Sequence, residues 1–385
     1  MIESRVLTAP RHAPSVFQLG RRLVVFICLA LLLAGAVWLL LAWQHVRDEQ
    51  LTRMATTVRL VAAHADHYFA ALGNKLEVLA RDLAPLDPVA RPQETLALLK
   101  AFRDAQPDLI GVGIVRPDGQ LLVTTQSGPR ARLPNMLSNP EMRADCAQAL
   151  RVTGLSIGRP QPGYLAGRWV IYARHTVRDR SGKVSYLIQA GILLEKQQEL
   201  WHSLGLEADA ALGLLREDGY LISRIPGPPS ADLYNRPALG GALYAATRVQ
   251  PQAGHYQGRV VDGSYRFGAY QRLARQPMYA FLSHRPATLV AAWWEDVRLP
   301  LMLALGFLLA GVIGYWRIAA RYRGRLRAVE TRLSEPGTGA TAELPSSGMR
   351  EIDTLVAALA DTQAQLRSAA LNRERQLLIA ADAGT

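Results

Sequence analysis

The sequence predicts an α+β protein. Two similar modules, each an antiparallel sheet with helices, follow one long helix and lie between two membrane-spanning helices. Three observations support this prediction. Two stretches without a charged residue are long enough to cross a bilayer, a helical stripe follows the first of them, and a hairpin motif occurs twice along the chain.

Composition narrows the class of protein. The 385 residues suffice for about two or three domains, and the net charge of +12 is spread along the chain rather than gathered in a basic block with aromatic residues. Binding of nucleic acid is therefore not expected. The two cysteines, Cys28 and Cys146, form neither a disulfide framework nor a metal-ligand pattern, so no metal site and no cofactor are predicted.

The two membrane-spanning helices are predicted at residues 23–43 and 299–316, which contain no charged residue. The first is interpreted as a retained anchor rather than a cleaved signal peptide, because it ends in bulky residues. Arginines lie before it, in residues 1–22, and after the second span. The positive-inside rule therefore places both termini in the cytoplasm and residues 44–298 outside the membrane, in the periplasm of a Gram-negative cell.

Residues 44–84 are predicted to form one long helix, on the order of 60 Å in length. Its apolar residues recur every three or four positions: Met54, Val58, Val61, Ala65, Tyr68, Leu72, Leu76, Leu79 and Leu83. Such a stripe needs a partner. Either the helix packs on the domain that follows, or it pairs with the same helix of a second subunit. On the same helix, His64, Asp66 and His67 are interpreted as a solvated face rather than as metal ligands.

The repeated motif is a hairpin of two apolar strands around an Asp-Gly turn. It reads GIVRPDGQLL in residues 113–122 and GLLREDGYLI in residues 213–222. Helices and strands then recur in the same order, so residues 85–204 and 205–298 are predicted to be two copies of one module. In the first copy, helices are expected at 95–103, 140–152 and 195–204, and further strands at 155–159, 168–178 and 183–194. In the second copy, a helix is expected at 236–246, and further strands at 255–261, 265–273 and 278–284.

The candidate ligand-binding residues are cationic and aromatic side chains in the first module: Arg159, Tyr164, Arg168, Trp169, Tyr172 and Arg174. Alternation along a strand puts Arg168, Tyr172 and Arg174 on one face. A pocket there would suit a small organic anion, through pairing of arginine with a carboxylate between aromatic walls. The alternative is that the arginines are exposed and the aromatic rings pack in the core.

No nucleophile elbow, phosphate loop or zincin motif is present, so no enzyme activity is predicted for these residues. The hairpin occurs in both copies and is therefore expected to be scaffold. Function is expected where the copies differ, in residues 161–174 of the first and 263–270 of the second.

In this order of elements, residues 44–297 resemble the double Cache sensor domain of bacterial receptors, which consists of two PAS-like modules. The stretches ALGLLREDGYLISRIP and GSYRFGAYQRL resemble the version found in receptors that drive cyclic di-GMP enzymes. The resemblance implies a receptor in the bacterial inner membrane. A small-molecule ligand would bind the membrane-distal module, residues 85–204, and a signal would cross the bilayer to a cytoplasmic output such as a diguanylate cyclase or phosphodiesterase.

The same resemblance adds Arg143 to the candidate site by its pocket position. The Arg-x-Trp-Tyr pattern of the amino-acid-binding subclass is absent, because Ala144, Asp145 and Cys146 follow Arg143. An amino-acid ligand is therefore not predicted. Two alternatives stay open: the sensor of a histidine kinase or chemoreceptor, and a periplasmic protein-interaction module without a small-molecule ligand.

Residues 317–372 resemble a HAMP signalling relay, with a plain coiled-coil linker as the alternative. Their amphipathic helices suit a parallel bundle, so a homodimer is expected. Residues 373–385 include LLIAADAGT, which resembles the opening of a cytoplasmic PAS domain and implies a longer protein.

Overall fold

The computed structural model describes residues 16–128, 132–163, 168–179, 181–194, 201 and 206–334, together with several residues between 354 and 373. They form two units, Leu41–Asp296 and the remainder of the chain. Tyr164, most of the helix expected at 195–204, and residues 335–353 of the HAMP-like segment lie outside the described residues.

Helix α1 (Val16–Leu83) is continuous and contains both the predicted first span and the predicted stripe. Of the nine stripe positions, all but Tyr68 are buried, and the adjacent Phe69 is fully buried. Side chains of the stripe share one hydrophobic core with residues of both modules. The helix therefore packs on the domain that follows it, which is the first of the two alternatives that its apolar stripe left open.

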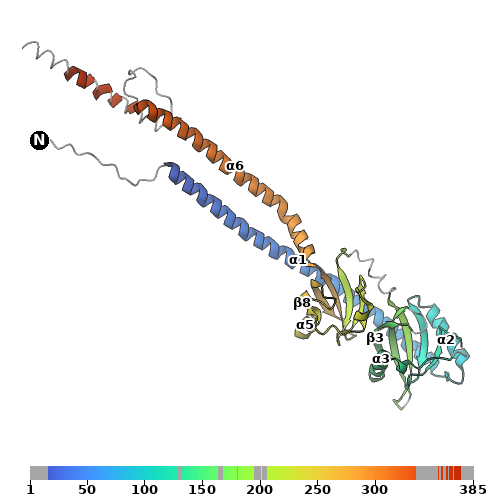
Figure 1. Cartoon of the computed structure of the whole chain (residues 1–385). Coiled ribbons are helices and arrows are strands. Elements are labelled where there is room, and N and C mark those ends of the chain that lie inside the picture. Colours follow the sequence, from blue (N-terminus) through green and yellow to red (C-terminus); the bar gives the residue numbers. More distant parts are fainter. Residues whose placement is uncertain are drawn as a thin grey trace, which may run out of the picture. The chain divides into compact units, whose positions relative to one another are not determined.

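The first module is a five-stranded antiparallel sheet with strand order β2-β1-β5-β4-β3 (Figure 1). Its strands are β1 (Leu109–Val115), β2 (Leu121–Thr124), β3 (Leu155–Pro162), β4 (Trp169–Arg178) and β5 (Val184–Leu193). Its described helices are α2 (Pro92–Asp104), the 3-10 turn η1 (Met136–Ser138) and α3 (Pro140–Arg151). Helix α3 begins where the Asn139 side chain accepts a hydrogen bond from the Glu141 amide, at 2.8 Å, with Pro140 in the first turn.

The second module repeats this topology, with strand order β7-β6-β10-β9-β8. Its elements are β6 (Ala211–Arg216), β7 (Leu221–Ile225), η2 (Ala231–Tyr234), α5 (Ala242–Val249), β8 (Ala253–Arg259), β9 (Tyr265–Arg272) and β10 (Met278–His284). The predicted duplication and the α+β class are thus confirmed. Helix α5 begins later than the expected residue 236, because Pro237, Gly240 and Gly241 break the helical pattern before it.

The two hairpins have the same geometry. In each, the arginine amide donates to the carbonyl of the residue after the turn, Arg116 to Gln120 at 2.9 Å and Arg216 to Tyr220 at 2.8 Å. The turn glycines have φ of 87° at Gly119 and 89° at Gly219, a left-handed conformation that residues with a Cβ rarely adopt. The Asp-Gly pair therefore serves the turn in both copies.

The first sheet is buried on both faces by different elements. One face joins the core of α1 and α2, with Ile114 and Ile188. The opposite face packs against η1 and α3, in a separate core that contains Met142, Val170 and Tyr172. This second face, called the α3 face below, carries the candidate site.

Two helices are long and apolar enough to cross a membrane: Leu19–Leu83 within α1, and Pro286–Arg325 within α6 (Pro286–Ser334). In their most apolar windows, the buried share of residues is 0% and 6%. Apolar side chains that are left exposed over this length suit contact with lipid.

Candidate ligand-binding site

The α3 face brings together side chains from β4, β5 and α3. Because side chains alternate along a strand, Val170, Tyr172 and Arg174 of β4 point to this face. Gln189 of β5 pairs with Arg174 in the ladder and lies beside it. Of the predicted residues, Tyr172 and Arg174 are therefore neighbours on one face.

Arg174 is a buried cation, with 1% of its surface exposed. Its Nε donates to Gln189 Oε1 at 2.9 Å, and its guanidinium carbon lies 5.3 Å from the centre of the Tyr172 ring. One terminal nitrogen lies 4.0 Å from the sulfur of Met142 on α3. Among the described residues, no carboxylate forms a salt bridge with Arg174. Its contacts are therefore with neutral groups.

A second buried arginine, Arg159 of β3, does have a carboxylate. Its backbone amide and its Nε donate to Asp145 of α3, at 2.9 and 3.3 Å. Another nitrogen of the guanidinium donates to the Glu141 carbonyl at 2.8 Å. Arg159 thereby ties the edge strand to the start of α3, which is a structural role.

Asp145 also accepts a hydrogen bond from the second module. Arg216, at the end of β6, donates to Asp145 at 3.4 Å and to the Ile157 carbonyl at 3.1 Å. The ring of Tyr220 lies under both arginines, 4.5 Å from Arg159 and 5.6 Å from Arg216. One buried carboxylate, only 2% exposed, thus joins the two modules. We call Asp145, Arg159, Arg216 and Tyr220 the module junction.

The α3 face and the module junction together hold an excess of buried positive charge. Arg159, Arg174 and Arg216 are all nearly buried, and Asp145 is the buried carboxylate among them. Asp218 also pairs with Arg216, at 2.8 Å, but its side chain is 46% exposed. Burial of an uncompensated charge is costly, so this region favours an anion.

A small cavity of about 30 Å³ lies on the α3 face. Its floor is backbone, because the central strands carry glycine there: Gly111, Gly113 and Gly191. Tyr172 and Gln189 form part of its wall. The exposed Gln126 side chain covers Gly111 so closely that a Cβ on Gly111 would lie 2.7 Å from its Cγ. The cavity has room for about one water molecule until such a side chain moves.

The other predicted residues lie elsewhere. Arg143 is exposed and donates to the Leu137 carbonyl at 2.9 Å, which closes η1 against α3. Arg168 is exposed and precedes β4. Trp169 points away from the α3 face and packs on Tyr234 of the second module, with ring centres 5.3 Å apart. Tyr164 lies outside the described residues.

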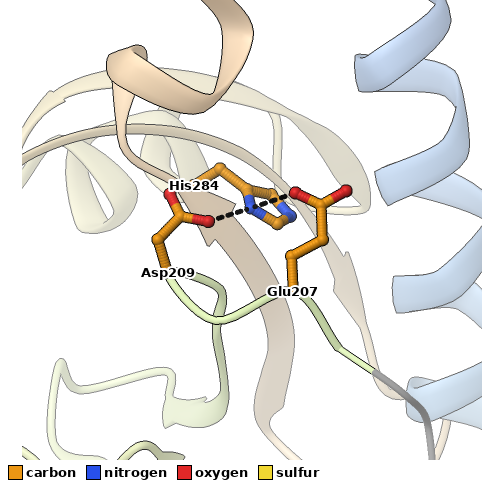
Figure 2. A group of neighbouring side chains, drawn as sticks. All are labelled: Glu207, Asp209 and His284. Atoms are coloured by element: carbon orange, nitrogen blue, oxygen red, sulfur yellow. Dashed lines mark hydrogen bonds and ion pairs between the residues drawn. The ribbon is translucent and has the colours of Figure 1, made fainter. Parts of the chain in front are cut away.

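A separate group of potential metal ligands lies where β10 leads into α6 (Figure 2). His284 Nδ1 lies 3.0 Å from Asp209 and 3.5 Å from Glu207. Asp209 also accepts from the Arg285 amide, at 2.8 Å, and from the Thr288 hydroxyl. Burial alone would raise the pKa of Asp209, but the hydrogen bonds from Thr288 and His284 outweigh it and lower that pKa. Asp209 is thus engaged in holding the first turn of α6.

Comparison with known proteins identifies the fold. No protein-family model matches the sequence, and no curated protein is significantly similar to it. Among solved structures, the extracellular domain of rpHK1S-Z16, assigned as a histidine kinase, matches with a TM-score of 0.52 and 22% identity, over 64% of this chain and 98% of that one. The chain contains the fold of an extracellular sensory domain.

Two further likenesses are weaker. The extracellular domain of soHK1S-Z6, also assigned as a histidine kinase, matches with a TM-score of 0.49 and 12% identity, over 65% of this chain and 99% of that one. The ligand-binding domain of the Pseudomonas aeruginosa PAO1 amino acid chemoreceptor PctB, in complex with L-Arg, matches with a TM-score of 0.48 and 14% identity, over 63% of this chain and 97% of that one.

Three polar residues of the α3 face and the module junction were not predicted from the sequence: Asp145, Gln189 and Arg216. Gln189 had a signal, since it is the polar residue inside the apolar run YLIQAGILL. The sequence signal for Asp145 was weaker: it is a charged residue at a helix position that the structure shows to be buried. The sequence signal for Arg216 was misleading, because its hairpin also occurs in the first module, where the equivalent Arg116 is exposed.

Proposed function

We propose that this chain is the sensory region of a transmembrane receptor, and that its first module binds a small organic anion on the α3 face. The observation that carries the proposal is Arg174, a cation with 1% exposure that has only neutral partners among the described residues. A carboxylate beside it would offset the cost of burying its charge.

The ligand would enter beside Tyr172 and Gln189, above the glycine floor. Because the cavity measures about 30 Å³, and ligand pockets commonly measure about 300 to 1,000 Å³, binding requires side chains to move. Gln126 is the first candidate, because it is exposed and covers Gly111. Such a rearrangement gives the bound and ligand-free states different structures, which a sensor needs.

The module junction offers a route for the signal. Asp145 is the buried carboxylate near Arg174, and it also binds Arg216 of the second module. An added anion would compete with Asp145 for the surrounding arginines and so bias the contact between the modules. Only a ligand that prefers one of the two arrangements can shift such an equilibrium.

The receptor would work as a homodimer in the lipid bilayer, with residues 44–298 outside the inner membrane and both termini in the cytoplasm. For its output we propose an enzyme of cyclic di-GMP synthesis or hydrolysis, supported by the resemblance of residues 211–226 and 263–273. A histidine kinase or chemoreceptor output fits the fold equally well. Cyclic di-GMP measured in cells with and without the gene, before and after ligand addition, distinguishes them.

The binding proposal is tested on the full chain in detergent or nanodiscs. Thermal unfolding is followed with small dicarboxylates at constant ionic strength. A ligand at a hundred times its Kd stabilises by about 2.7 kcal/mol. We expect Arg174→Gln to abolish this shift and the control Arg143→Gln, on the exposed side of α3, to keep it. If no carboxylate stabilises the protein while a partner protein co-purifies with it, the protein-interaction alternative is favoured instead.

A further inference from the structure

The second module contains a pocket of its own on the face that corresponds to the α3 face. Strand pairing defines the correspondence. In the first module, Gly113 of β1 pairs with Gln189 of β5, and Gln189 pairs with Arg174 of β4. In the second module, Gly213 of β6 pairs with Phe281 of β10, and Phe281 pairs with Tyr270 of β9. Tyr270 therefore stands in the place of Arg174. Its hydroxyl lies 2.8 Å from two carbonyl oxygens of the α5 region, so it fills and closes that position.

The positive charge has moved along the strand instead. Four residues earlier, where the first module has Val170, the second has Arg266, which is 4% exposed. Arg266 lines a cavity of about 50 Å³ under α5, together with Arg224, Asp262, Tyr256 and Ser283. The rest of the lining is mostly apolar.

The charges around this cavity do not balance. Arg224 and Asp262 form a salt bridge of 2.9 Å with both side chains buried. Arg266 donates instead to neutral oxygens: the Ser264 hydroxyl and the Asp209 carbonyl, both at 3.1 Å. Among the described residues it forms no salt bridge. Burial and the nearby Arg224 lower the pKa of Arg266, and this effect outweighs that of Asp262, which raises it.

A second observation points to a missing acceptor. The Tyr256 hydroxyl is buried beside this cavity, and no described residue accepts from it with good hydrogen-bond geometry. Its polar neighbour is the Ser283 side chain, whose weak interaction lowers the pKa of Tyr256 less than burial raises it. Burial raises the pKa of Tyr256 to about 12, so the group is a protonated donor at neutral pH. Buried donors without an acceptor are rare and costly. A positive excess and an unused donor therefore line the same small cavity.

We propose that this pocket is a second binding site, separate from the one on the α3 face, for a monovalent anion of very few heavy atoms such as formate or acetate. The carboxylate accepts from Tyr256 and balances Arg266. The size follows from the cavity, about 50 Å³, against about 30 Å³ for each molecule of liquid water.

The site is well placed to act on α6. Arg266 binds the Asp209 carbonyl, while the Asp209 side chain holds the Arg285 amide and Thr288 at the first turn of α6. Arg266 is therefore connected through Asp209 to the first turn of the helix that leads into the second span, and anion binding at Arg266 can affect that helix. A small metabolic anion could in this way set the response to the ligand of the first module.

The test uses the full chain in nanodiscs, with sodium formate and sodium acetate as probes and sodium chloride at equal ionic strength as reference. Binding is measured by calorimetry and by thermal unfolding. We expect Tyr256→Phe to weaken acetate binding about tenfold, and Arg266→Gln to abolish it. Arg174→Gln and Tyr270→Phe should leave the affinity unchanged, because neither side chain lines the pocket.

Three outcomes would overturn the proposal: equal stabilisation by every anion, unchanged acetate affinity in Tyr256→Phe, or loss of acetate binding in Arg174→Gln. If Arg266→Gln does not fold, Tyr256→Phe decides, since it removes a hydroxyl that makes no hydrogen bond of good geometry with the described residues. Failure here leaves the proposal for the first module intact, because that proposal depends on Arg174.

Discussion

Arg159 and Arg174 are both buried in the first module, yet their surroundings differ. Arg159 bonds to Asp145 and to a helix carbonyl, whereas Arg174 has Gln189, the face of Tyr172 and a sulfur atom. Removing one partner of a buried ion pair leaves the other charge uncompensated and lowers the stability of the fold. Removing a buried cation that has no counter-ion leaves no such charge behind. Burial alone therefore does not separate a structural arginine from a ligand-binding one.

This difference gives a prediction at the residue scale. Arg159→Leu leaves Asp145 without its nearest cation and should destabilise the first module by about 3–5 kcal/mol. Arg174→Leu leaves only the Gln189 amide oxygen unpaired and should cost less than about 1.5 kcal/mol. Thermal unfolding of the two variants, without added anions, makes the comparison. Equal losses would show that Arg174 is structural and would remove the basis for the proposed site.

At the scale of single elements, periodic patterns were reliable. The stripe of α1, the duplicated hairpin and the succession of strands along each module depend on local sequence, and the structure contains all three. The prediction that Tyr172 and Arg174 lie on the same face of the sheet followed from the alternation of side chains along β4. The contacts of Asp145 could not be predicted, because Arg216 lies 71 residues away and reaches it only once the modules are packed.

Helix α1 is fixed to the second module by a polar contact as well as by its apolar stripe. Asp66 accepts from the amides of Ala274 and Arg275, both at 3.0 Å, in the turn between β9 and β10. This contact gives the acidic residue at this position of the helix a structural role.

At this scale we predict that Asp66→Ala lowers stability by about 1–3 kcal/mol, because two turn amides lose a charged acceptor. Glu77→Ala is the matched control: it also removes a carboxylate from α1, but one whose salt bridge, with Arg81, lies on an exposed surface. Such pairs contribute about 0.2–1 kcal/mol. Hydrogen exchange at residues 274–275 provides a second measure, and unchanged protection there in Asp66→Ala would contradict this role.

On the scale of the whole molecule, the two modules contain hairpins with the same geometry but different contacts. The Arg116–Asp118 pair is solvated, whereas Arg216, which makes the same pair with Asp218, is 5% exposed and also reaches Asp145 in the other module. The expectation that the hairpin is scaffold therefore describes the first copy fully, while the second copy also forms the contact between the modules.

The two arginines form a natural matched pair for testing whether this contact makes the modules cooperate. Arg216→Ala removes a buried partner of Asp145 and the stacking on Tyr220 but leaves the Arg159–Asp145 pair. We expect the parent to unfold in one calorimetric transition and the two modules of this variant to unfold at separate temperatures, because the contact that joins them is lost. Arg116→Ala should keep one transition, since its side chain is exposed. A single transition in both variants would mean that α1, which packs on both modules, is enough to couple them, and that the signal passes along the helix rather than through the module junction.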